Sequence, residues 1–433
     1  CPNDALDDGD GDGICGDVDN CPVTPNAGQS DGDLDGLGAA VAGGRRPVVE
    51  DAERPGKSAA GDHLLHQQRV ARAQAHVADL ALERLPGRLV VDTGDVEGAE
   101  LVVDGDLPEV PTYLDSPMGI EATALGDLSE GNVTIRVAWS GINYKDALAA
   151  TGEGKILRRY PLNGGIDVAG TVVASDSDEF QPGDRVLANG SGLSETRDGG
   201  YSEYLRLPDS MVVPLPAGLS LREAMGIGTA GFSAAMSLDR MEQNGQRPEM
   251  GPIVVTGASG GLGTIAIDLL TAAGYEAHAI TGKIEEFDWL EHLGAKQCIS
   301  RHDLHWGQRP LETARWAGCI DTVGGDMLAG LTRVIEPWGN IASCGMAGGH
   351  GLHTTVFPFI LRGVSLLGES STNCDIETRR RLWDRLGNEW KPPHLDEIIS
   401  EEVALDGMEP IFQRLLRGEA RGRSVVRIDP SAE

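Results

Sequence analysis

Small residues follow a short apolar run in the second half of the sequence, where 252–257 leads into Ala258-Ser259-Gly260-Gly261-Leu262-Gly263. This is the AxGxxG form of the turn that holds a dinucleotide pyrophosphate between a buried strand and a helix. Gly260 would let the main chain approach the phosphates, and Gly263 would let the helix pack closely on the strand. The free N–H groups of the helix N-terminus would attract the anion. We therefore expect a nicotinamide dinucleotide at Ser259, Gly260, Gly261, Leu262 and Gly263.

The end of the next expected strand bears on which nicotinamide cofactor binds. Enzymes that use NADH usually place an Asp or Glu there to bind the ribose 2′-hydroxyl. Here the residues are Thr281, Gly282 and Lys283, and Arg301 comes directly after the strand that follows. A carboxylate would repel a 2′-phosphate, whereas a hydroxyl, an open backbone and a cation accept one. The sequence predicts NADPH, and the missing acid carries this prediction because a lone lysine is more often a solvated surface charge.

A sheet with crossover helices is needed to hold these residues at one edge. Beyond Gly251 the apolar pattern predicts strand, helix, strand units, with further strands at 276–281, 296–300, 318–323 and 340–344. From Leu101 onward, short alternating runs such as 131–140 are separated by Gly and Pro turns, which predicts a compact, mostly β region. We expect an α/β protein in which this β region precedes a doubly wound parallel sheet of the Rossmann type.

Several longer segments carry a family resemblance that covers about residues 101–430. In order and composition they resemble the quinone oxidoreductase-like arm of the medium-chain dehydrogenase/reductase superfamily; they are 143–146, 165–170, 181–186, 199–204 and 228–235. The resemblance implies a GroES-like catalytic domain at 100–225, a Rossmann NADP-binding domain at 226–365 and a return to the catalytic domain at 366–433. It also implies a homodimer that pairs through an edge strand of the Rossmann sheet, for which 356–367 is the candidate.

Within that arm, Asn143-Tyr-Lys-Asp146, Thr281-Gly-Lys283, 316–324 and 354–362 look most like acryloyl-CoA reductases. This resemblance implies NADPH-dependent reduction of acryloyl-CoA to propionyl-CoA. The alternative is a quinone or enone reductase with a broader pocket. The family resemblance further implies that Thr229 and Arg423 contact the cofactor, and that Arg423 does so at a phosphate. The basic run 379–381 is a second candidate for phosphates, those of an acyl-CoA, although a charged run on a helix is usually a solvated face.

Zinc-dependent members of the superfamily hold their catalytic metal with a Cys and a Gly-His-Glu triplet, because Zn²⁺ needs three fixed protein ligands. This chain has Asn143 and Gly165-Ile166-Asp167 instead, and no four closely spaced cysteines occur near 190–196. We therefore expect a zinc-independent site, in which positioning and hydrogen bonding replace metal polarisation.

The loop that contains Asn143 supplies the expected catalytic residues. The resemblance implies that Asn143 and Tyr144 act as donors near the substrate and nicotinamide, with Asp146 orienting them. The alternative source of the proton that the reduced double bond receives is water. The structural alternatives are a packing aromatic for Tyr144 and a helix N-cap for Asp146.

The first hundred residues have a different character. Asp8, Asp10, Asp12, Asp17 and Asp19 recur at alternate positions in an acidic segment at 1–38, which resembles a thrombospondin type 3 calcium-binding repeat and could wrap oxygen ligands around Ca²⁺. Cys1, Cys15 and Cys21 leave one thiol unpaired, and a disordered acidic tail is the alternative. Residues 39–99 predict a linker with at most one frayed helix around 63–85.

These features leave a third hypothesis open, in which 1–38 is an extracellular calcium-binding module and the reductase part is incidental. The reductase part by itself is expected in the cytoplasm. The net charge of −31 disfavours nucleic acid and anionic membrane partners, and no run of eighteen apolar residues occurs. The expected partner is a small acyl-CoA or enone substrate.

Overall fold

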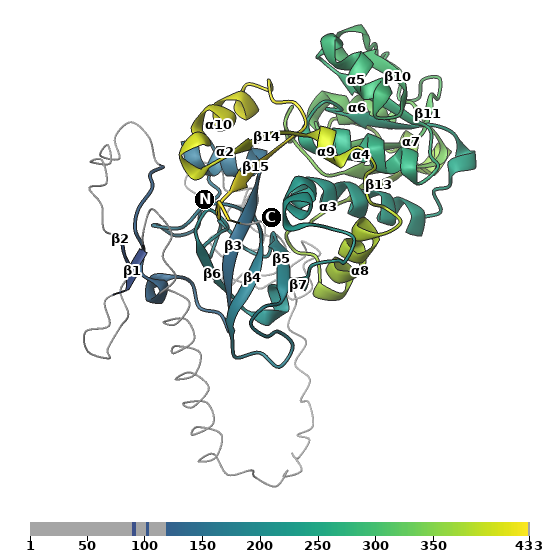
Figure 1. Cartoon of the computed structure of the whole chain (residues 1–433). Coiled ribbons are helices and arrows are strands. Elements are labelled where there is room, and N and C mark those ends of the chain that lie inside the picture. The colour runs from purple at the N-terminus through teal and green to yellow at the C-terminus, as the bar shows by residue number, and fades with distance from the viewer. Residues whose placement is uncertain (1–88, 92–100, 104–117, 432–433) are drawn as a thin grey trace, which may run out of the picture. The chain divides into compact units, whose positions relative to one another are not determined.

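The structure, a computed structural model, describes residues 89–91, 101–103 and 118–431. One large sheet has seven strands in the order β14-β15-β3-β4-β5-β7, with β6 paired to β3 (Figure 1). The strands are β3 (Val133–Ile142), β4 (Asp167–Ser175), β5 (Arg185–Asn189), β6 (Tyr204–Leu207), β7 (Val213–Pro214), β14 (Ile399–Val403) and β15 (Arg423–Arg427). Alternate residues of β3 are buried at its start and every residue is buried at its end. Strands β14 and β15, which come late in the chain, therefore complete the sheet that β3 begins.

The second large sheet has six parallel strands in the order β10-β9-β8-β11-β12-β13. They are β8 (Ile253–Thr256), β9 (Ala277–Thr281), β10 (Ala295–Ser300), β11 (Trp316–Asp321), β12 (Ile335–Ser343) and β13 (Ser365–Gly368). Numbered from β8, this order is 3-2-1-4-5-6, which is the Rossmann arrangement. The switch point of the order lies beside β8, so the turn after β8 lies where such sheets bind ligands.

Helix α3 (Leu221–Gln243) joins the two sheets. Its first turn is closed by Ser220 and Glu223, each of which bonds the other's backbone N–H. Phe232 belongs to a buried cluster that also contains Trp139 of the first sheet and Ile253 of the second. The helix thus fixes the two sheets to one shared core.

The other helices cover the sheets or connect them (Figure 1). They are α2 (Tyr144–Thr151), α4 (Gly261–Ala272), α5 (Phe287–His292), α6 (Gly325–Thr332), α7 (Phe357–Arg362), α8 (Ile376–Gly387), α9 (Leu395–Ile398) and α10 (Glu409–Leu416). No helix within the described ranges combines the length and apolar character that a bilayer span requires.

The structure differs from the sequence-based expectations at three boundaries. A short antiparallel pair, β1 (Leu89–Val91) and β2 (Leu101–Val103), includes residues expected to be linker. The Rossmann domain, expected to end at 365, includes β13 as far as Gly368. The stretch 356–367, expected to supply the edge strand, does so only in its last residues, which begin β13, whereas Phe357–Arg362 form helix α7. Pro358 favours a first helical turn, and Gly363 ends the helix with φ +63°. The edge itself is β13.

Candidate active site

The glycine-rich turn has the expected strand, turn and helix context. Gly257 has φ +59°, and helix α4 begins after Gly260 without a side-chain cap on its first N–H groups. A side chain on Gly263 would press on the carbonyl of Gly257 and lie 2.6 Å from Ala258 Cα, so only glycine allows this helix to pack on the strand. The open first turn of α4 therefore suits an anion.

The end of β9 lies next to this turn. Ser259 Oγ and Thr281 Oγ1 are 2.9 Å apart and both residues are buried. A Cβ built on Gly282 would lie 2.6 Å from Nε of Arg301, so the Arg301 side chain passes directly over the bare backbone of Gly282. Arg301 is exposed and makes no hydrogen bond or ion pair within residues 118–431. An uncommitted guanidinium thus lies where a 2′-phosphate is expected.

Lys283 is held differently from Arg301. Its ammonium group donates to the carbonyl oxygen of Ala420 and is half-buried. Burial lowers the pKa of this ammonium, and the nearby negative charge of Glu286 offsets only part of that effect by raising it. Lys283 therefore contributes less free positive charge to the end of β9 than Arg301 does.

Asn143 is the N-cap of α2 and lies almost fully buried. Its backbone N–H and its side-chain amide both donate to Asp146 Oδ2, at 2.9 and 3.1 Å. The same amide nitrogen donates to Asp167 Oδ2 at 2.8 Å. Both side-chain N–H groups are therefore committed to carboxylates. In the structure, neither side-chain N–H of Asn143 is left for a substrate, contrary to the expectation that this residue donates to one.

Asp146 orients Asn143, as its place on the loop suggests, but it lies at the third position of α2 and is not the N-cap. Its other oxygen accepts the backbone N–H of Ile166 at 3.1 Å. Burial, and next the charge of Asp167, raise the pKa of Asp146 from 3.8 to about 7. The negative charge of Asp167 disfavours a second negative charge on the buried Asp146. The protonation of Asp146 therefore makes this cluster sensitive to pH.

Asp167 is the centre of the cluster, although its place in the sequence indicated only that Gly165-Ile166-Asp167 replaces the Gly-His-Glu triplet of zinc-dependent members. It is fully buried at the start of β4. Besides Asn143, it accepts the backbone N–H of Thr229 at 2.9 Å and the Thr229 hydroxyl at 2.6 Å. That N–H is available because Gly228, with φ +50°, breaks the regular path of α3. A Cβ on Gly228 would lie 2.5 Å from Asp167 Oδ2, so the kink needs glycine. The cofactor contact expected of Thr229 stays a prediction, since its hydroxyl proton is already donated to Asp167.

Arg423 also departs from expectation. Its guanidinium is 3% exposed and donates to the carbonyl oxygens of Ile142 and Gly226 at 2.9 Å and to Asn143 Oδ1 at 3.1 Å. Its Nη2 lies 3.8 Å from Asp167 Oδ2. A charge buried among carbonyls and a carboxylate does not face a cofactor phosphate. Arg423 instead locks the Asn143 loop to α3 and β15.

The stem of Arg423 connects this cluster to the glycine-rich turn. A Cβ on Gly261 would lie 2.8 Å from Arg423 Cδ, and the backbone N–H of Gly422 donates to the Ser259 carbonyl at 3.1 Å. The expected catalytic loop and the expected cofactor turn therefore meet through one residue of the last strand.

Tyr144 is the donor that remains on the loop. It begins α2, it is 41% exposed, and its hydroxyl bonds to no residue that the structure describes. Unlike Asn143, it is free to meet a substrate.

The basic run 379–381 serves the fold. Arg379 is buried and donates to the carbonyl and side-chain oxygens of Asn189, at 2.7 and 2.8 Å. Arg381 pairs with Asp239 at 2.6 Å. These commitments rule against the expected contact with acyl-CoA phosphates.

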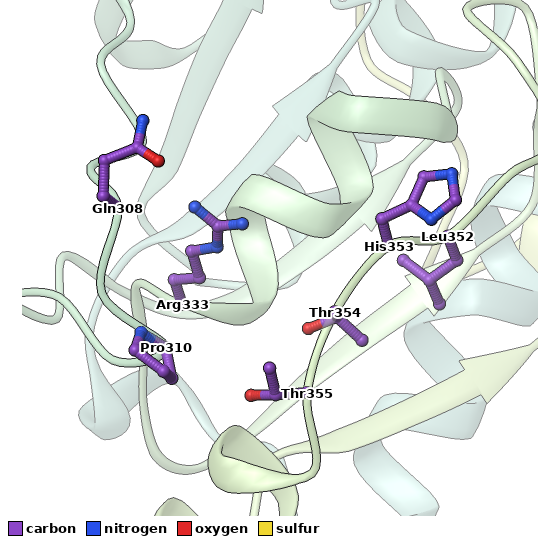
Figure 2. Close-up of a pocket in the computed structure, with 7 residues that line it drawn as sticks. All are labelled: Gln308, Pro310, Arg333, Leu352, His353, Thr354 and Thr355. Carbon is purple, nitrogen blue, oxygen red and sulfur yellow. The ribbon is translucent and has the colours of Figure 1, made fainter.

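A hollow of about 360 Å³ lies elsewhere on the Rossmann unit (Figure 2). Its lining includes Arg333, His353 and Thr354, and none of its residues belongs to the glycine-rich turn or the Asn143 loop. We do not place the reaction there.

Comparison with known proteins supports the family resemblance. Residues 129–217 match the alcohol dehydrogenase GroES-like domain, and 261–388 match the zinc-binding dehydrogenase family. The chain is 45% identical to the "Putative quinone oxidoreductase YhfP" of Bacillus subtilis (strain 168), over 72% of this chain and 96% of that protein. The chain belongs to the medium-chain dehydrogenase/reductase superfamily.

Two further members of the superfamily are similar along nearly their whole length. Acrylyl-CoA reductase AcuI of Ruegeria pomeroyi is 40% identical over 76% of this chain and 98% of that protein. The crystal structure of E. coli K-12 YhdH with bound NADPH is 40% identical, with a TM-score of 0.69 over 72% of this chain and 95% of that one. YhfP has been solved with NAD bound, at 41% identity and a TM-score of 0.70, over 78% of this chain and 98% of that one.

Some superfamily members hold zinc, so the metal-binding capacity of this site matters. In the part of the chain that the structure describes, one group of three or more His, Cys, Asp or Glu residues lies close enough to share an ion, and it contains neither Asn143 nor Asp167. The calcium site expected at Asp8, Asp10, Asp12, Asp17 and Asp19 lies outside the described residues and stays a prediction.

Proposed function

We propose that the chain is an NADPH-dependent, zinc-independent reductase of an activated carbon–carbon double bond, acting on acryloyl-CoA to give propionyl-CoA. The observation that carries the proposal is the junction at Arg423, which holds the Asn143 loop against the glycine-rich turn. The names of AcuI and of NADPH-bound YhdH support the substrate and the cofactor.

The chain would hold NADPH with residues that fit its charge. The uncapped first turn of α4 receives the pyrophosphate, and Arg301, over Gly282, receives the 2′-phosphate, with Thr281 and Lys283 beside it. When bound, NADPH supplies a hydride for the β-carbon of the enoyl thioester.

The remaining requirements fall to side chains. Charge that develops on the thioester oxygen needs a preorganised donor, and the α-carbon needs a proton. The Tyr144 hydroxyl, at the start of a helix whose N-cap is fixed by Asp146 and Asp167, is suited to the first task. The proton comes from Tyr144 or from water. Asn143 sets the position of Tyr144 through the backbone that they share.

A steady-state comparison tests substrate and cofactor together. Purified protein should oxidise NADPH faster than NADH with acryloyl-CoA, and more slowly with crotonyl-CoA. Tyr144→Phe should lower kcat by 10²-fold or more, because removal of one oxyanion donor has that effect in other enzymes. Tyr160→Phe is a matched control, since Tyr160 is also exposed but lies off the loop. Rapid oxidation of NADPH by a simple quinone, with acryloyl-CoA left unchanged, would favour the alternative that the name of YhfP supports.

We also propose that the chain forms a homodimer through the region of β12, α7 and the edge strand β13. Large apolar side chains lie exposed there; they are Trp338, Val356, Phe357, Ile360 and Leu361. Such a group is unusual on a monomer's surface and is typical of an interface between subunits.

A further inference from the structure

Two histidines and a glutamate meet at the surface, and none of them belongs to the active site described above. His292 ends α5, His394 precedes α9, and Glu397 lies within α9. One potential ligand atom from each residue lies within 4.8 Å of the other two. His292 Nε2 is 3.0 Å from Glu397 Oε2, and the two imidazole rings are 5.1 Å apart between centroids.

A buried carboxylate behind His394 gives the group the form of a metal site. Asp268, on α4, is 1% exposed, and its Oδ1 lies 2.8 Å from His394 Nδ1. Its Oδ2 accepts the backbone N–H of His394 at 2.9 Å. A carboxylate that accepts the Nδ1 proton fixes the imidazole tautomer and leaves Nε2 as a free lone pair. Histidines that bind metals are oriented in this way by a second carboxylate or carbonyl.

The charge and ligand types favour a divalent transition metal. The two imidazoles are neutral ligands, whereas Asp268 and Glu397 are acidic and close enough for the charge of Glu397 to act on Asp268. Two histidines and one glutamate are a ligand set that zinc accepts, with water in the fourth position. His292 and Glu397 are about half exposed, so an ion can enter from solvent.

We infer that His292, His394 and Glu397 form a surface site for Zn²⁺ or a similar divalent transition-metal ion. Asp268 orients His394 in this site, and the site is separate from catalysis. The site spans two parts of the fold. α5 belongs to the Rossmann unit, and α9 leads directly into β14 of the seven-stranded sheet. A bound ion therefore ties the Rossmann unit to the segment that returns the chain to the catalytic domain.

Calorimetric titration of the full chain with Zn²⁺, in excess Ca²⁺, tests this inference. Excess Ca²⁺ occupies oxygen sites such as those expected at 1–38. His292→Ala and Glu397→Gln should each remove one equivalent of bound Zn²⁺ or weaken it at least tenfold. Asp268→Asn should weaken it by about tenfold to a hundredfold, the usual effect of losing an outer carboxylate. His302→Ala, another exposed histidine, should bind as the unaltered protein does.

Two further readouts separate this site from others. Co²⁺ bound at the site should show d–d absorption that His292→Ala abolishes, without the thiolate charge-transfer band that cysteine ligands produce. Zn²⁺ should raise the melting temperature of the unaltered protein and not that of His292→Ala. Reductase activity of metal-free His292→Ala should be unchanged, so failure of the proposed reaction and failure of this site are distinguishable. Equal stoichiometry and affinity in the unaltered protein and all variants would overturn the inference.

Discussion

Replacing Arg301 by alanine tests how the chain distinguishes the two nicotinamide cofactors. The side chain lies over Gly282 and has no partner in the described ranges, so its loss disturbs no other contact there. A hydrogen bond to a charged group contributes about 1.5–3 kcal/mol. At about 1.4 kcal/mol for each tenfold change, Arg301→Ala should raise KM for NADPH by roughly tenfold to 150-fold.

The same substitution should leave KM for NADH nearly unchanged, because NADH lacks the 2′-phosphate. The assay is steady-state kinetics with both cofactors at two salt concentrations, since screening should reduce the difference. Arg309→Ala is the control, because Arg309 pairs with Glu312 on the same unit. An equal loss with NADPH and NADH would refute the assignment of Arg301 to the phosphate.

Three further substitutions test the buried cluster and the dimer. Asp167→Ala leaves the Arg423 charge buried and unpaired, so the free energy of unfolding in urea should fall by about 3–5 kcal/mol. Because its pKa is raised, Asp146 keeps its proton in the folded state up to about pH 7, whereas the unfolded chain loses it near 3.8. The free energy of unfolding should therefore fall as pH rises between these values, by at most about 4 kcal/mol. Urea titrations of Asp146→Asn should show a smaller fall over the same range. Ile360→Glu places a charge in the exposed apolar group, and sedimentation should show monomers where the unaltered protein shows dimers.

Local patterns made much of the fold predictable. The glycine-rich turn, the strands around it and the parallel order follow from apolar periods and from glycine spacing, which act over a few residues. The stretch 356–367 supplies the edge strand only from Ser365 onward, because Pro358 favours a helix start and Gly363 ends that helix before the strand begins.

The cluster around Asp167 was less predictable for a physical reason. Asn143 and Arg423 are far apart in sequence, and nothing near either residue indicates that the other consumes its hydrogen bonds. A buried polar residue and a ligand-binding residue look alike until their partners are known. Asp167 gave one sequence signal, its place in the triplet where relatives bind zinc, and that signal concerned metal rather than hydrogen bonding.

Arg423 has a consequence for how the protein is made. It lies in the final strand, and its bond to the Ile142 carbonyl spans 281 positions of the chain. During synthesis the Asn143 loop is finished long before Arg423 leaves the ribosome, so the nascent protein lacks the group that fastens the loop. We expect a product that ends before Arg423 to leave the carbonyl of Ile142 and the side chain of Asn143 without this partner.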